Sequence, residues 1–266
     1  MDYTLVLGVD ANHLEKLKLV WPTWVQHKPS LLQQHLVVFY DPDGLDKKDV
    51  SDAIIEHPDV RFVAWGVPPY APSNYFDLGV DDKWHNPQRY KMLAGFVHVP
   101  ASYVTTRYWL KLDLDVVATG NDDWVDESWF DGDPAIVAHR WGYTKPPNQM
   151  QLLDAWHQKV SCIFDPLNLV PKEGSSTLSH KRIISWCGFF NTEFTELCAA
   201  LASKYCGVRK LPVPSQDGYL WYMAAARGKK IVRCNMKARG WRHLSNLKNI
   251  KDAVLESLHG QQDSQA

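Results

Sequence analysis

The first 115 residues alternate between two hydrophobic patterns, and this alternation constrains the fold more than any other feature of the chain. Short apolar runs that are typical of strands lie at Tyr3–Val9, His35–Tyr40, Val60–Trp65 and Tyr108–Leu112. Apolar residues recur at helical spacing over Asn12–Gln26, Lys47–His57 and Asn86–Val99. Strands separated by helices of this length predict βαβ units, hence an α/β fold with a mostly parallel sheet and helices on both faces.

The second half of the chain is less regular. Strand patterns lie at Ala135–His139, Ile183–Phe190 and Lys230–Cys234, and helical patterns at Met150–Val160 and Gln216–Arg227. Residues 142–182 form a long polar stretch in which Pro171–Thr177 offers little to pack, so we expect a lid, a binding loop or disorder. The polar tail 260–266 is expected to be disordered. Pro22 predicts a break in the first helix, because proline lacks a backbone N–H.

Composition narrows the class of protein. With 266 residues the chain is long enough for one large domain, which we place at residues 1–259. A net charge of −1 gives no basic surface for nucleic acid. No apolar run approaches the roughly 18 residues of a membrane span, and Met1–Asp10 lacks a signal-peptide pattern. The five cysteines are odd in number and include no Cys-x-x-Cys pair, so we expect a reducing, cytoplasmic environment.

Two aspartates, Asp113 and Asp115, follow the Tyr108–Leu112 strand with one residue between them. Residues i and i+2 of an extended chain point to the same side, so both carboxylates are aimed at one place, where their like charges repel. A hard divalent cation would cancel the repulsion and take both as ligands. In open α/β sheets, ligands bind at the carboxyl ends of strands, where this pair lies. The alternative is an acidic turn extended by residues 121–123.

Four segments resemble one family of enzymes. They are NPQRYKMLAGFVHVPASYVTTRYWLKLDLDVVATG (86–120), ISWCGFFNTEF (184–194), PSQDGYLWYMAAARG (214–228) and RGWRHLSN (239–246). Together they resemble the nucleotide-sugar glycosyltransferases of the GT-A fold, whose Asp-x-Asp holds Mn²⁺ or Mg²⁺ on the diphosphate of the donor. The layout is close to glycosyltransferase family 8, although that family's terminal His-x-x-Gly-x-x-Lys-Pro-Trp is absent. The resemblance implies a single GT-A-like, Rossmann-like domain with a nucleotide-binding half (1–120) and an acceptor half (121–259) that contains loop 142–182.

The resemblance also implies a metal site and a catalytic group. Asp113, Asp115 and His243 would bind the metal, with Asp115 a direct ligand and Asp113 partly turned toward the ribose. Asp217, at the start of a helix, would be the catalytic carboxylate, a general base if the reaction inverts configuration. The plain alternatives are a surface or core histidine at 243 and a favourable helix-terminus charge at 217.

Four further residues would contact the donor. Asp10 would contact the base or ribose, Arg242 the diphosphate and Gly188 the sugar, while Lys91 would reach the donor from the helix before the Asp-x-Asp strand. The alternatives are a helix N-cap for Asp10, a strand bulge for Gly188, and solvated surface charges for the two cations.

The implied activity is metal-dependent transfer of a sugar from a nucleotide-diphosphate sugar to an acceptor hydroxyl, on a saccharide or another molecule, in glycan or polysaccharide synthesis. A UDP-sugar is the first candidate donor. An Asp-x-Asp phosphatase or nucleotidyltransferase is the enzymatic alternative, since LDLDVVAT loosely matches the haloacid-dehalogenase motif, although that motif lies near the N-terminus of those proteins. Twelve tryptophans also fit a non-catalytic carbohydrate-binding protein, although large aromatic residues more often fill cores.

Overall fold

The computed structural model describes residues 1–64, 94–140, 183–206 and 216–259. Several predictions lie outside these ranges: the donor contact of Lys91, the helix at Met150–Val160, the lid at Pro171–Thr177, the loop 142–182 as a whole and the tail 260–266.

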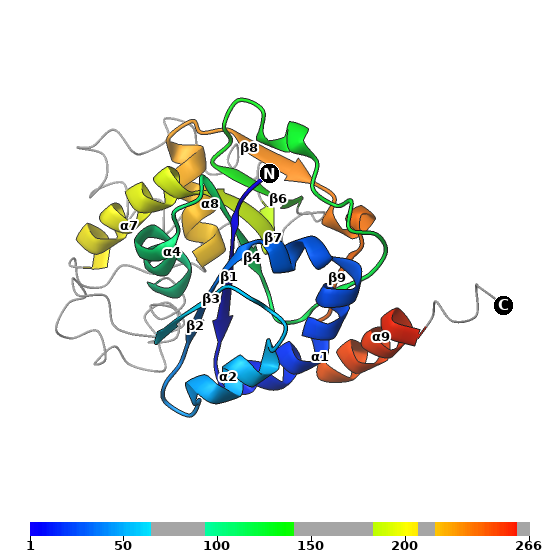
Figure 1. The fold of residues 1–266 in the computed structure, drawn as a ribbon. Helices are drawn as coiled ribbons and strands as arrows, with labels where there is room; N and C mark the ends of the chain where they lie inside the picture. Colours follow the sequence, from blue (N-terminus) through cyan, green and yellow to red (C-terminus); the bar gives the residue numbers. More distant parts are fainter. Residues whose placement is uncertain (65–93, 141–182, 207–215, 260–266) are drawn as a thin grey trace.

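A seven-stranded sheet forms the centre of the described structure, with the strand order β3-β2-β1-β4-β7-β6-β8 (Figure 1). The strands are β1 (Thr4–Val9), β2 (His35–Tyr40), β3 (Val60–Ala64), β4 (Tyr108–Leu112), β6 (Ile136–Arg140), β7 (Ile183–Asn191) and β8 (Ile231–Cys234). β7 is antiparallel to both of its neighbours, and all the other neighbouring pairs are parallel. The predicted α/β class with a mostly parallel sheet is confirmed.

Helices cover both faces of the sheet, as predicted (Figure 1). One face carries α1 (Ala11–His27), α2 (Lys47–Ala53) and α9 (Leu247–His259), and the other carries the π-helical turn η2 (Ala94–His98), α4 (Val99–Tyr103), α7 (Thr192–Cys206) and α8 (Gln216–Ala226). Short 3-10 turns lie at η1 (Pro29–Gln33), η3 (Glu127–Phe130) and η5 (Met236–Arg239). The helix predicted over Lys47–His57 ends earlier, at Ala53.

The strands divide their side chains between two hydrophobic cores, one on each face. In β1, Leu5 and Leu7 join one core and Val6 joins the other, as the period of two requires. Tryptophans fill much of both cores: those at positions 21, 24, 109, 124, 186, 221 and 241 are buried. In the described part of the chain, the tryptophans therefore serve mainly as packing residues.

The predicted break at Pro22 is wrong, because α1 continues through this residue. The flanking side chains Trp21 and Trp24 are buried, and Trp24 Nε1 donates a hydrogen bond to the carbonyl oxygen of Val116 at 2.7 Å. Fully burying a large side chain stabilises by roughly 2–3 kcal/mol, so two such contacts offset the ~3 kcal/mol cost of an internal proline.

A two-stranded ribbon lies apart from the main sheet. β5 (Val116–Ala118) pairs antiparallel with β9 (Trp241–His243), and the pairing sets Val116 opposite His243. Strands of three residues are too short to be recognised from a hydrophobic pattern in the sequence. The ribbon brings β9 beside the segment that follows β4.

Gly240 fixes the start of β9. Its φ is +80°, and a Cβ on this residue would lie 1.9 Å from the carbonyl oxygen of Thr119. The two backbones are also bonded, because Thr119 N donates to Gly240 O at 2.7 Å. A residue with a side chain cannot occupy this position without moving the ribbon.

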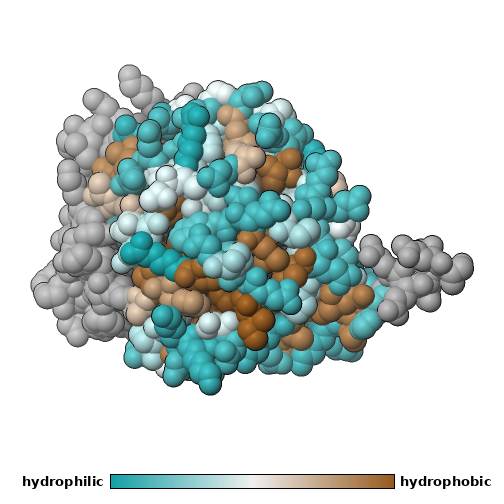
Figure 2. Space-filling model, viewed as in Figure 1, coloured by the Kyte–Doolittle hydropathy of each residue, from teal (hydrophilic) through white to brown (hydrophobic). Residues whose placement is uncertain are grey.

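The described surface mixes polar residues with a hydrophobic band across the lower half of the visible face (Figure 2). A groove between α1 and α2 is lined by apolar residues such as Trp21, Pro22 and Val25 together with polar residues such as Lys18 and Asp52. No helix within the described ranges combines the length and apolar character that a membrane crossing requires.

Replacing Gly240 by alanine tests the ribbon. We expect Gly240→Ala to lower the free energy of unfolding by at least ~3 kcal/mol, because strain at positive φ adds to a backbone clash. Gly228 is the matched control: its φ is +61°, but a Cβ there would meet no atom within 4 Å. Gly228→Ala should cost only about 1 kcal/mol. Urea denaturation measures both, and equal losses would contradict the proposed role of the Thr119 contact.

Candidate metal and donor site

The aspartate pair lies at the carboxyl edge of the sheet. β1 and β4 are parallel neighbours, with Val6 opposite Lys111. Asp10 follows the last residue of β1 and Asp113 follows the last residue of β4, so both emerge at the same edge. This is the edge at which open α/β sheets bind their ligands.

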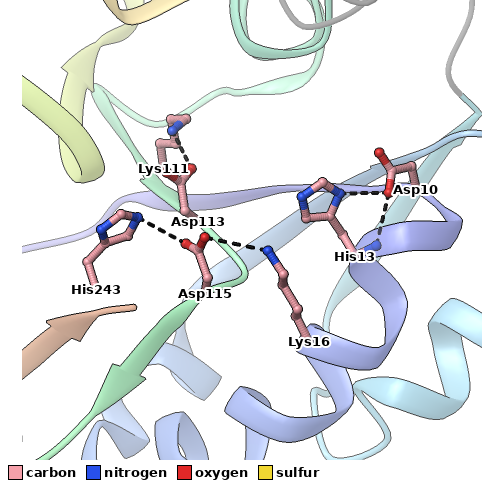
Figure 3. A network of polar contacts seen from close by, with 7 residues as sticks. All are labelled: Asp10, His13, Lys16, Lys111, Asp113, Asp115 and His243. Carbon is pink, nitrogen blue, oxygen red and sulfur yellow. Dashed lines mark hydrogen bonds and ion pairs between the residues drawn. The ribbon is translucent and has the colours of Figure 1, made fainter. Parts of the chain in front are cut away.

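Asp113, Asp115 and His243 meet at this edge, as the sequence analysis predicts. Each offers one ligand atom, and these atoms all lie within 4.8 Å of one another. His243 Nε2 lies 3.2 Å from Asp115 Oδ1 (Figure 3). This buried oxygen forms no hydrogen bond of good geometry with the described residues, so it is available to a ligand. Two carboxylates and an imidazole form a ligand set that suits Mn²⁺, and the residues present therefore fit a divalent cation.

The ribbon explains how His243 reaches the aspartates. The pairing of β5 with β9 places His243 opposite Val116, and Leu244 N donates to the carbonyl oxygen of Asp115 at 2.9 Å. Two hydrogen-bonded segments that are far apart in sequence thus hold a carboxylate and an imidazole side by side.

Opposing effects set the charge of Asp115. Burial alone would raise its pKa, but His243 and, more weakly, the ammonium group of Lys16 outweigh burial and hold the pKa below its ordinary value. Lys16 Nζ, on α1, lies 3.6 Å from Asp115 Oδ2 (Figure 3). Asp115 is therefore a carboxylate, the form that a metal ligand needs.

Asp113 is paired with a buried lysine that the sequence analysis does not include among its site residues. Lys111 Nζ donates to Asp113 Oδ1 and, at 2.9 Å, to the carbonyl oxygen of Ser185. The ammonium group also lies 4.9 Å from the centre of the Phe96 ring. The Lys111 side chain is only 1% exposed. The expectation that the two aspartates repel each other until a cation binds is corrected here, because Lys111 already neutralises Asp113.

An irregularity in β7 forms one wall of the site. Between the pairs Ala138–Gly188 and His139–Ile184, β6 advances by one residue while β7 advances by four. The extra residues of β7 include Ser185, whose carbonyl oxygen receives Lys111, and Trp186, whose carbonyl oxygen accepts a hydrogen bond from Asp113 N at 2.8 Å.

Trp186 also positions the predicted imidazole ligand. Its ring stacks on His243, with ring centres 5.7 Å apart and planes 14° from parallel. The His139 ring also lies 5.0 Å from the Trp186 ring. Trp186 is 3% exposed, so His243 rests on a fixed aromatic surface. Sequence patterns gave no sign of this contact.

Two predicted donor contacts have structural partners in this arrangement. Asp10 is the N-cap of α1: it accepts from His13 N at 2.9 Å and contacts His13 Nδ1 at 2.6 Å. Arg242 binds Glu256 on α9 at 2.8 Å, and it alternates with His243 along β9, so it faces away from the aspartates. Donor binding by either residue remains a prediction, and for Arg242 it would require the pair with Glu256 to open.

Gly188 and Asp217 occupy the predicted elements. Gly188 lies in β7 between Lys111 of β4 and Ala138 of β6, and a Cβ would approach Ala138 Cβ to 3.0 Å. Its position at the irregularity supports the bulge interpretation, while contact with the sugar remains a prediction. Asp217 is the second residue of α8, so it does lie at a helix start.

No family model matches the chain, and neither does any curated protein sequence. Solved structures do match. One is core-mannan synthase A (CmsA/Ktr4) from Aspergillus fumigatus in its Mn/GDP form, with a TM-score of 0.61, 11% identity, and coverage of 92% of this chain and 75% of that chain. Another is an active-site mutant of LgtC, with a TM-score of 0.50, 12% identity, and coverage of 87% of this chain and 72% of that chain. The protein has a GT-A fold. The GT-A resemblance predicted from the sequence is thereby confirmed at the level of the fold.

Because Asp113 is paired with the buried Lys111, we expect the two aspartates to differ in how much they contribute to the stability of the protein. Asp113→Ala should lower the free energy of unfolding by about 2–4 kcal/mol, because it leaves the buried ammonium group of Lys111 without its counter-ion. Asp115→Ala should cost less, about 1 kcal/mol, because both of its partners, Lys16 and His243, are partly exposed. Adding Lys111→Met to Asp113→Ala should recover most of the loss. Urea denaturation without metal measures all three variants, and equal losses for the two aspartates would contradict this account.

Proposed function

We propose that this protein is a metal-dependent glycosyltransferase that moves a sugar from a nucleotide-diphosphate sugar to an acceptor hydroxyl. The observation that carries the proposal is the convergence of Asp113, Asp115 and His243 within 4.8 Å at the carboxyl edge of a GT-A sheet. Core-mannan synthase A, which shares this fold, was solved with Mn and GDP.

The chemistry needs a site that stabilises a leaving nucleoside diphosphate while positive charge develops at the anomeric carbon. A bound Mn²⁺ or Mg²⁺ would supply electrostatic stabilisation of the leaving diphosphate. Asp113, Asp115 and His243 would hold that cation. Trp186 keeps the His243 ring in place, and Lys111 fixes Asp113, so the ligand set is organised before the donor arrives.

The finer assignments are part of the same proposal. Asp10, Lys91, Gly188 and Arg242 are the proposed donor contacts, and Asp217 is the proposed catalytic carboxylate. Residues 1–120 would bind the nucleotide and residues 121–259 the acceptor, with loop 142–182 shaping the acceptor site and Pro171–Thr177 as its lid.

A UDP-sugar is the first donor to test, and the GDP bound to core-mannan synthase A makes a GDP-sugar the second. We place the protein in the cytoplasm on its cysteine usage, and this placement is supported by the free thiols of Cys187, Cys198 and Cys234 in the described part of the chain.

Metal-dependent binding of a nucleoside diphosphate tests the proposed site. We expect UDP or GDP to raise the melting temperature of the wild-type protein with Mn²⁺ and not with a chelator. Asp115→Asn should lose this Mn²⁺-dependent shift, because an amide is a poorer, uncharged ligand for a hard cation. Asp126→Asn, which alters an exposed aspartate paired with Arg239, is the matched control and should keep it. An unchanged shift in Asp115→Asn would rule out Asp115 as a ligand.

Asp217→Asn separates catalysis from binding. Asparagine keeps the size of the side chain and suits a helix start, but it neither accepts a proton nor carries charge. Donor and metal affinity should stay near wild type in calorimetry, while the transfer rate falls by roughly 10²-fold. A near-normal transfer rate would leave Asp217 as a helix-terminus charge only.

Three measurements on the wild-type protein separate the alternative functions. Slow release of nucleoside diphosphate from nucleotide sugars with Mn²⁺ is expected of a transferase. Phosphate release from simple monoesters would indicate the phosphatase instead, and saccharide binding that a chelator does not affect would indicate a carbohydrate-binding protein.

A further inference from the structure

Two lysines lie against the two aspartates, one on each. Lys111 Nζ contacts Asp113 Oδ1, and Lys16 Nζ lies 3.6 Å from Asp115 Oδ2 (Figure 3). The two carboxylates and the two ammonium groups therefore cancel in the metal-free site. A divalent cation would enter a site that is already neutral, whereas an isolated aspartate pair would attract it strongly.

The two lysines differ in their freedom to move. Lys111 is 1% exposed and is held by Asp113, by the carbonyl oxygen of Ser185 and by the face of Phe96. Lys16 lies on α1 with its side chain 21% exposed, and its distance to Asp115 is longer than a hydrogen bond. Lys111 is thus a fixed counter-ion, while Lys16 can change partner by rotating its side chain.

We propose that Lys16 is a diphosphate-binding residue that pairs with Asp115 only while the site is empty. When a metal shares the carboxylate of Asp115, the negative charge that faces Lys16 falls, and the ammonium group turns to a phosphate oxygen of the donor. The charges match this exchange. Two carboxylates, two ammonium groups and a dication leave a surplus of two positive charges, which equals one negative charge on each phosphate of a nucleotide-sugar diphosphate.

This exchange makes metal and diphosphate binding mutually dependent. Metal alone weakens the pair between Lys16 and Asp115, because the cation shares the carboxylate charge, and the ammonium group gains no new partner. Diphosphate alone must also draw Lys16 away, which leaves His243 as the remaining partner of the Asp115 carboxylate. When both bind, each charge has a partner, so each ligand raises the affinity of the site for the other. The inference rests on the proposed function and adds to it a donor-binding residue and a coupling between ligands.

Lys16→Gln tests the exchange through two affinities that should move in opposite directions. Without nucleotide, the variant should bind Mn²⁺ roughly three- to tenfold more tightly, because a competing cation is gone. At saturating Mn²⁺, it should bind UDP or GDP roughly tenfold more weakly, because a charge-assisted contact is lost. Electron paramagnetic resonance of free Mn²⁺ measures the first affinity, and calorimetry measures the second.

Two variants serve as controls. Lys18→Gln removes an exposed lysine of the same helix that lines the groove beside α2, and it should leave both affinities unchanged. Lys16→Arg keeps the charge and should preserve the wild-type coupling. Circular dichroism of each variant reports whether α1 is intact.

The outcomes separate this inference from the proposed function. If wild-type protein binds Mn²⁺ with UDP or GDP but Lys16→Gln behaves like Lys18→Gln, the role of Lys16 is overturned and the proposed function stands. If Lys16→Gln weakens both affinities, Lys16 is a structural residue and the inference is likewise wrong. If wild-type protein binds neither Mn²⁺ nor nucleoside diphosphate, the proposed function falls and this inference falls with it.

Discussion

The ion pair between Lys111 and Asp113 is the interaction on which the arrangement of the site depends. A lysine side chain that is 1% exposed can stay charged only where partners compensate for lost hydration, and Asp113 with the Ser185 carbonyl oxygen provides that compensation. The irregularity in β7 supplies this carbonyl oxygen, and it also turns Trp186 toward His243. A local departure from regular sheet geometry thus connects the fixed aspartate to the imidazole.

The sequence predicts the central strands and the first helix of this protein well, and there is a clear physical reason. Buried strands such as β1 and β2 are continuous apolar runs, and the helix between them shows apolar residues at regular spacing, so both elements can be recognised without tertiary information. The position of Asp113 and Asp115 at a carboxyl edge follows from the same pattern. The failure at Pro22 shows the limit of local rules, since burial of Trp21 and Trp24 outweighs a local preference that disfavours the helix.

The site is only partly predictable, because its residues meet through contacts that sequence spacing does not encode. His243 was found through a family resemblance, while the ribbon that places it beside Asp115 is too short to show a pattern. Lys16 reaches Asp115 from a helix that lies far away in sequence. For Lys111 a signal did exist: a single lysine inside an apolar strand, two residues before Asp113 and therefore on the same side. Helix α9 could also have been predicted, because Ile250, Ala253 and Val254 are buried at helical spacing.

The pairing of β5 with β9 affects when, during synthesis of the chain, the three candidate ligands can come together. Domains emerge from the ribosome from the N-terminal side, so Asp113 and Asp115 are available well before β9. A nascent chain that has exposed only the first four strands of the sheet holds two of the three candidate metal ligands and lacks the imidazole. The full set of candidate ligands therefore comes together only after β9 has been translated and has docked on β5. The ribbon in this way makes assembly of the candidate site a late event that follows completion of the sheet.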